Sequence, residues 1–455
     1  LIHCLQIGKV FVDKEYGQII KMAGPIAIGI ASFVLIHLVD LYWVGHLGEK
    51  ALAALCVAGG FLFFVFTLTG ILRTSLTTVV SQALGREDED TMREATASGL
   101  LLGLLIGSFV FVIAKWQLPT LLSLLGLAGE TAMEAQEYCT ILFWGIPLWF
   151  VSEAAVGHFF GRGKMVVLMV VILCANLLNA IADPLLILGY GPFPKLGISG
   201  AAIASLSAVS FAGIAYLFVI FYRGYVRLSD FKVLTKYWPK LLTIGVPATG
   251  REVGRPLANL VLFSIVAPFG EATVAALGIA MRYAGVMGTY IGALAVTLSS
   301  LAGRKIGAGD EDTIEPLLVK GLRLGLIIHV IQATAMTFFA PTFLSLFDGS
   351  GQVVVAGTPL IRIFAWSSTF VLCTHVMNSA FKGSGHTTPI FLSSFFANWF
   401  IQVPMACIAA WLLLNPLAVW IVLGLSHACE AIAAGSFYVT YSWLPDKDET
   451  MARVK

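Results

Sequence analysis

The feature that most constrains this sequence is an internal repeat with a constant spacing of 222 residues. Residues that match at this spacing run without a gap from about position 25 to about position 400. They include Pro25 with Pro247, Gly48 with Gly270, Gly161 with Gly383, and Asn176 with Asn398. A single offset kept over this length indicates a duplicated unit. In an apolar chain, such a duplication is typical of secondary transporters.

The composition places most of the chain inside a lipid bilayer. Of 455 residues, 58% are hydrophobic and 12% are charged, whereas soluble domains carry about 25% charged residues. So few charges cannot cover a soluble protein of this size, and lipid must therefore cover it. The net charge is +2 and the chain has no basic arm, which argues against a nucleic-acid partner. Seven scattered cysteines lack metal-ligand spacing, and we expect no cofactor.

Apolar stretches near 20 residues long predict an all-α polytopic membrane protein with twelve spanning helices, six in each repeat. We place them at about 18–44, 52–84, 94–116, 133–158, 165–189, 198–222, 240–264, 274–305, 316–340, 356–380, 387–413 and 416–442. An even number of spans per repeat predicts two lobes related by a pseudo-two-fold axis along the membrane normal. The chain then divides into an N-terminal lobe at 1–222, a cytoplasmic linker at 223–239 and a C-terminal lobe at 240–455.

The distribution of Lys and Arg predicts the orientation in the membrane. With the N-terminus inside, the outer segments hold only Lys50, Lys115 and Lys195, and the inner segments hold most of the other basic residues. This bias predicts a multi-pass protein of the cell membrane with both termini in the cytoplasm.

Several motifs together resemble one transporter family. They are VDLYWVGHLG at 39–48, GRG at 161–163 with its echo KGSGHTTP at 382–389, and GISGAAIA at 197–204. The chain resembles the multidrug and toxic compound extrusion (MATE) family over nearly its whole length. Its aspartates in the first and fifth spans are most similar to the archaeal or DinF-like branch. The resemblance implies a monomeric antiporter, not an enzyme, that exports bulky, often cationic or amphipathic, drug-like compounds in exchange for inward Na⁺ or H⁺.

Two carboxylates inside predicted spans are the main candidates for a cation or proton site. Asp40 and Asp183 lie at similar depths below the outer surface, and burying each costs roughly 3 kcal/mol on insertion scales. Asn179 lies one turn before Asp183 on the same helix face. At the 222-residue spacing, Leu262 and Met405 replace the two aspartates. Because a group needed by the architecture should recur in both halves, we predict that Asp40, Asn179 and Asp183 bind the coupling ion.

Five further residues are candidates for substrate binding or for support of the site. Tyr138 matches a polar position in the related branch, or is an ordinary interfacial tyrosine. His37 precedes Asp40 by one turn and is either a proton relay or a packed histidine. Asn176 recurs as Asn398, which favours a structural role. Glu252 and Arg255 have apolar counterparts in the first half. They form either an internal ion pair or, at Glu252, a second functional carboxylate.

The coupling ion is predicted to be H⁺ rather than Na⁺. The family resemblance implies a hydroxyl from the sixth span in a Na⁺ site, and this chain has Ala201 there, with Ser199 and Ser205 nearby. A Na⁺ site at Asp40, Asn179 and Asp183 therefore lacks one expected ligand. Two carboxylates in a medium of low dielectric constant do not both stay charged easily, so one takes a proton or both share a cation.

Two alternative functions remain. A lipid-linked precursor flippase of the same superfamily would need basic residues facing phosphates, and Arg251 and Arg255 give it some support, whereas the first-lobe aspartates argue against it. An intramembrane aspartyl protease would use a pair such as Asp40 and Asp183. The chain lacks the Tyr-Asp and Gly-x-Gly-Asp settings of that class, and a protease does not explain the repeat.

Overall fold

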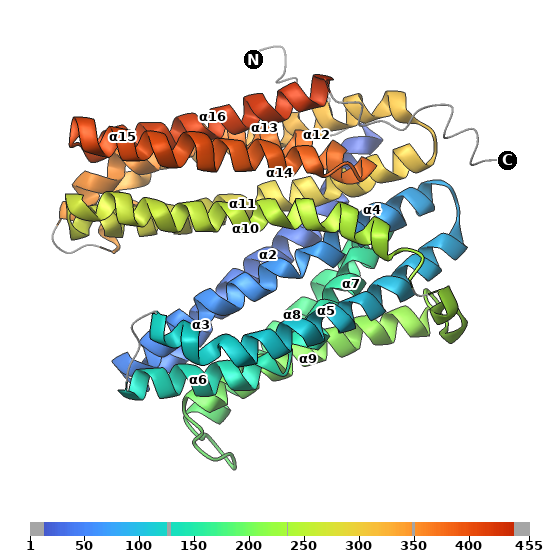
Figure 1. The fold of residues 1–455 in the computed structure, drawn as a ribbon, viewed down its shortest axis with the longest axis horizontal. Helices are drawn as coiled ribbons and strands as arrows, with labels where there is room; N and C mark the ends of the chain where they lie inside the picture. The colour runs from blue at the N-terminus through green and yellow to red at the C-terminus, as the bar shows by residue number, and fades with distance from the viewer. Residues whose placement is uncertain (1–12, 125–128, 234, 348–350, 441–455) are drawn as a thin grey trace. The chain divides into compact units, whose positions relative to one another are not determined.

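The computed structural model describes residues 13–124, 129–233, 235–347 and 351–440, and within these ranges the chain is helical without a strand (Figure 1). The helices group into two compact units. The first unit, Gly24–Gly245, contains most of α2 (Lys14–Gly45) and then α3 (Glu49–Leu68), α4 (Gly70–Gly85), α5 (Glu89–Leu124), α6 (Gly129–Phe143), α7 (Ile146–Arg162), α8 (Met165–Ile187), α9 (Ile198–Tyr222) and the 3₁₀ helix η2 (Leu228–Val233).

The second unit runs from Val246 onward and includes the start of α2 up to Ala23. Its helices are α10 (Trp238–Val266, which begins in the first unit), η3 (Ala267–Phe269), α11 (Glu271–Gly307), η4 (Glu311–Thr313), α12 (Ile314–Ser345), α13 (Gln352–Ser384), α14 (Thr388–Phe395), the π-helix η5 (Phe396–Gln402), α15 (Val403–Leu413) and α16 (Pro416–Thr440). Ile19 of α2 is fully buried in a core of this unit with Leu298 and Phe381.

The segment at 223–239, expected as a linker, packs on the first unit. Lys236 Nζ donates to Glu94 Oε2 of α5 at 3.1 Å, and the Tyr237 hydroxyl donates to the same oxygen at 3.0 Å. The Trp238 indole donates to the Ser98 carbonyl at 3.2 Å. The two compact units divide between Gly245 and Val246, inside α10.

The number of spanning segments agrees with the sequence prediction. In the part of the chain that the structure describes, eleven segments are long and apolar enough to cross a membrane, and the bent pair of α6 and α7 brings the number to as many as twelve. The 50° bend in that pair was not predicted. It falls at Trp144 and Gly145, just before Pro147 in the first turn of α7, where a proline starts a helix easily but cannot continue one.

The duplication recurs in the backbone. Gly48, before α3, has φ 110° and ψ 176°, and Gly270, before α11, has φ 101° and ψ 166°. Gly163 ends α7 in the left-handed conformation with φ 71°, and Gly385 ends α13 in the same way with φ 90°. Only glycine adopts such angles without strain. Positions 222 residues apart therefore have the same local conformation, as the repeat predicts.

The same spacing recurs in close helix packing. Gly99 lies against Leu76 in the first unit, and Gly321 lies against Leu298 in the second. A methyl group added at Gly161 would come within 3.0 Å of the Ser81 amide nitrogen. Each repeat thus holds its helices together through small residues at equivalent positions, as membrane helices commonly do.

We expect Gly383→Ala to destabilise the second unit by about 1–3 kcal/mol, because overpacking in a close-packed core carries that cost. The added methyl group would lie 2.9 Å from both the Ala302 Cβ and the Gly303 amide nitrogen. Gly278→Ala is the matched control, since no atom lies within 4 Å of its added methyl group. Thermal unfolding in detergent measures both variants. Equal midpoints for the two would contradict the packing argument.

Candidate functional site

The first unit brings the two predicted aspartates together. Asp40 near the end of α2 is 9% exposed, and Asp183 on α8 is fully buried. The two carboxyl groups are close enough to interact electrostatically. Asn179, one turn before Asp183, donates from its amide nitrogen to Asp183 Oδ1 at 3.1 Å. The three residues predicted as a site therefore form one buried cluster between two helices.

The pair is short of hydrogen-bond donors. Within the described residues, no donor reaches the buried atoms Asp40 Oδ1 and Asp183 Oδ2. An ionised carboxylate can only accept hydrogen bonds. Two such groups close together in a buried site are stable only when they share a proton or a cation. This arrangement can therefore take up and release one positive charge.

Tyr138 and a serine complete the surroundings of the aspartates. Tyr138 on α6 is buried, and its hydroxyl interacts with Ser205 on α9. It is also within electrostatic range of Asp40 and Asp183. A hydroxyl from the sixth span thus reaches the cluster through Tyr138, although the position expected for it is Ala201.

His37 and Asn176 lie at the margin of the cluster. The His37 side chain is 59% exposed, and its Nδ1 is 3.7 Å from Asp40 Oδ2. Its ring also packs on Phe33 with 4.5 Å between centroids. Asn176 donates to the Ser32 hydroxyl at 3.0 Å, a contact that ties α8 to α2.

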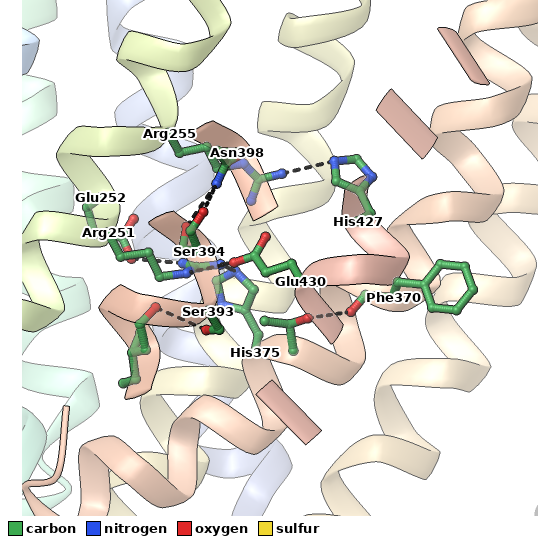
Figure 2. A network of polar contacts seen from close by, with 12 residues as sticks. Arg251, Glu252, Arg255, Phe370, His375, Ser393, Ser394, Asn398, His427 and Glu430 are labelled. Carbon is green, nitrogen blue, oxygen red and sulfur yellow. Dashed lines mark hydrogen bonds and ion pairs between the residues drawn. The ribbon is translucent and has the colours of Figure 1, made fainter. Parts of the chain in front are cut away.

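The second unit contains a different polar cluster, around Arg251 of α10 (Figure 2). Arg251 is 4% exposed, and its guanidinium lies 3.1 Å from Glu430 Oε1 on α16 and 3.2 Å from Glu252 Oε1. Its Nη2 is 3.4 Å from His375 Nε2 on α13. The ion pair considered for Glu252 in the sequence was with Arg255, whereas the ion pair in the structure joins Glu252 to Arg251.

Arg255, one turn further along α10, has a neutral partner. Its Nη2 is 3.3 Å from His427 Nε2, and His427 Nδ1 is 3.0 Å from the Ser367 hydroxyl. Because a guanidinium only donates, Nε2 must accept, and the proton of a neutral imidazole is then on Nδ1. Among the described residues, Arg255 takes part in no ion pair.

A cavity of about 400 Å³ lies beside this cluster, within the second unit. Arg255, His375 and His427 line it together with Gln402 of the π-helix η5. Its other walls are mostly apolar side chains from α10, α11, α13 and α16. A cavity of this size fits a small organic molecule, and π-helical turns are frequent at functional sites.

Sequence reasoning did not identify His375, Gln402 and His427 as site residues. One signal was available: His427 and Glu430 are three residues apart on the last span, so they lie on one face of that helix. Arg251 and Arg255 are four apart and form a matching stripe on α10. The two stripes indicate that α10 and α16 pair through polar side chains, and they leave open which arginine meets Glu430.

The chain matches known proteins along most of its length. The family model MatE matches residues 25–185 and 247–408, two segments that coincide with the two repeats. A protein named "FAD transporter" from Shewanella oneidensis is 28% identical over 74% of this chain and 75% of its own length. "Probable multidrug resistance protein YoeA" from Bacillus subtilis is 25% identical over 88% of this chain and 89% of its own.

Solved structures show the same fold. The "Crystal structure of MATE in the bent conformation" has a TM-score of 0.89 with 22% identity, and the match covers 98% of each chain. An "Outward-facing conformation of a multidrug resistance MATE family transporter of the MOP superfamily" has a TM-score of 0.87 with 22% identity, covering 94% of this chain and 95% of that one.

Proposed function

This chain belongs to the MatE family, whose members are multi-pass membrane transporters and not enzymes, and we propose that it is a secondary active antiporter that exports organic compounds in exchange for an inward-moving cation. The observation that carries the proposal is the buried pair of Asp40 and Asp183, which lacks hydrogen-bond donors at Asp40 Oδ1 and Asp183 Oδ2 among the described residues and has no counterpart in the second repeat. Burying two carboxyl groups inside a membrane costs free energy, and such groups usually persist because they bind and release an ion.

The proposed cycle couples this pair to substrate export. Binding of the cation at Asp40 and Asp183 competes with substrate or reshapes the site that holds it, and the two lobes alternate in access to each side. Each charge that enters gains about 2.3 kcal/mol per 100 mV of membrane potential. We further propose that the protein acts as a monomer in the cell membrane with both termini cytoplasmic. Its substrates would be amphipathic drug-like molecules, many of them cationic.

We propose H⁺ as the coupling ion. Asn179 donates from its amide nitrogen to Asp183 Oδ1, a contact that supports an ionised carboxylate. Sodium sites need several oxygen ligands, whereas a proton needs one carboxyl group and a neighbour to share it. His37, 3.7 Å from Asp40 and exposed, provides a route for the proton.

Ethidium efflux from proteoliposomes tests both parts of the proposal. We expect efflux when a pH gradient is imposed without Na⁺, and loss of that efflux when an ionophore collapses the gradient, because protonation of the pair supplies the driving force. Protein-free liposomes give the background. Efflux that follows a Na⁺ gradient at constant pH and ignores a pH gradient would assign the coupling to Na⁺. No efflux under either gradient would argue against the antiporter.

A further inference from the structure

We propose that the cavity of the second unit binds the carboxylate of an amphipathic organic anion, so that the substrates of this protein include apolar molecules with one negative charge. The binding part of this inference stands on the cavity alone, whereas its extension to export rests on the proposed function. The site follows from the donors of the cavity wall and their hydrogen-bond partners.

The first step concerns the charge on the wall. Arg251 is balanced by Glu430 and Glu252, at 3.1 and 3.2 Å. Arg255 lines the cavity, and the partner that the structure gives its guanidinium is the neutral ring of His427 at 3.3 Å. A guanidinium carries five donor hydrogens in a planar fork that suits a carboxylate. Glu430 and Glu252 are also within electrostatic range of Arg255, but within the described residues neither forms an ion pair with it, so Arg255 presents its donors to whatever occupies the cavity.

The second step concerns Gln402. This residue is 3% exposed, and its side-chain oxygen accepts from the Ser426 hydroxyl at 3.1 Å. Its Nε2 is buried, and no acceptor among the described residues reaches it. Because Gln402 lines the same cavity as Arg255, a ligand with acceptor oxygens would satisfy this otherwise costly group. It provides a second donor, independent of the arginine.

The third step concerns the size and charge of the ligand. Carboxylates are not among the lining residues in the described part of the chain, and Arg255 is the one permanently charged side chain in that set. One cation with neutral polar groups beside it matches a monoanion better than a dianion. Phe263, Met287 and Phe364 are among the apolar side chains of the wall, and they suit an aromatic or aliphatic body. The cavity thus selects a small aromatic or aliphatic carboxylate.

Three probes with one apolar body test the charge preference of the unaltered protein. They are 2-naphthylacetate, its neutral amide 2-naphthylacetamide, and the cation 2-(2-naphthyl)ethylamine. Tritiated 2-naphthylacetate is bound to purified protein at pH 7 without any gradient, and the unlabelled compounds compete with it. We expect the acid to bind at least about tenfold more tightly than the amide, and the amine to bind most weakly. A charge-assisted hydrogen bond contributes a difference in affinity of about this size. An acid that binds no better than its amide would overturn the proposal.

Variants locate the preference in the cavity. Arg255→Gln is expected to remove the advantage of the acid over the amide, and Arg255→Lys to retain part of it. Arg282→Gln is the matched control. It removes the same charge from an exposed residue of α11 that does not line the cavity, and we expect it to bind the acid like the unaltered protein. If Arg255→Gln keeps the preference, or if Arg282→Gln loses it, the site is elsewhere.

Gln402→Glu provides a second readout that does not remove the arginine. The change is nearly isosteric, and it replaces the amide donor with an acceptor and adds a negative charge. We expect the affinity for the acid to fall by about tenfold and the affinity for the amine to rise. Affinities of the acid and the amine equal to those of the unaltered protein would exclude Gln402 from the site and would overturn the two-donor arrangement.

The outcome is separable from the outcome of the efflux experiment. Binding of 2-naphthylacetate is measured at equilibrium without a gradient, so it does not depend on whether the protein exports ethidium. Efflux of ethidium without acid preference in the binding assay would leave the antiporter in place and reject the anion site. Acid-selective binding in a protein that exports nothing would retain the site and reject the antiporter.

Discussion

Asp40→Asn and Asp183→Asn are each expected to abolish gradient-driven ethidium efflux, down to the level of protein-free liposomes. Each change leaves a single carboxyl group, which no longer needs a shared proton or cation to offset a like charge. The site then stops exchanging its charge with the gradient. Initial efflux rates under an imposed pH gradient measure the effect.

Folding should survive these two substitutions. Asparagine is nearly isosteric with aspartate. In the unaltered protein, no donor among the described residues reaches Asp40 Oδ1 or Asp183 Oδ2. The new amide can donate a hydrogen bond to the carboxylate that remains. We therefore expect the thermal unfolding midpoint to stay constant or to rise. A variant that loses efflux together with a large loss of stability would point to a structural role.

Asp310→Asn is the matched control for this pair of variants. Asp310 is an exposed residue between α11 and η4, and the substitution makes the same chemical change outside the site. We expect its efflux to equal that of the unaltered protein. Normal efflux in both Asp40→Asn and Asp183→Asn would remove the pair from the coupling mechanism.

The second large effect is expected at the buried ion pair of the second unit. Glu430→Ala removes the carboxylate 3.1 Å from Arg251, where both side chains are at most 4% exposed. Removing one partner of a buried pair costs about 3–5 kcal/mol, because the other charge remains without compensation. For a unit of this size the unfolding midpoint should fall by roughly 10 °C. Differential scanning fluorimetry in detergent measures the midpoint.

A double variant separates the ion pair from simple loss of packing. Arg251→Met combined with Glu430→Leu removes both charges and keeps apolar volume, and such replacements are often neutral or stabilising. We expect the double variant to be more stable than Glu430→Ala. Glu315→Ala, at an exposed position in the first turn of α12, should change stability by no more than about 0.5 kcal/mol. A double variant less stable than Glu430→Ala would show that the pair contributes net stability.

The sequence alone determined the duplication, the number of spans and the positions of the two critical aspartates. These follow from properties that a chain carries locally: a run of about 20 apolar residues must be helical in lipid, and a carboxylate inside such a run is costly wherever it packs. The repeat then marked Asp40 and Asp183 as exceptions, because Leu262 and Met405 are their counterparts. The backbone angles shared by Gly48 and Gly270 agree with that register.

Only the tertiary structure decided which polar groups meet. Arg251 and Glu430 are 179 residues apart, and nothing in the periodicity of α10 or α16 specifies that Arg251 takes Glu430 while Arg255 takes His427. That choice depends on the rotation and offset of one helix against another, which the packing of many side chains sets together. The role of Gln402 could not be predicted for the same reason. Whether the amide of a polar residue in an apolar run lacks a hydrogen-bond partner depends on which residues pack around it.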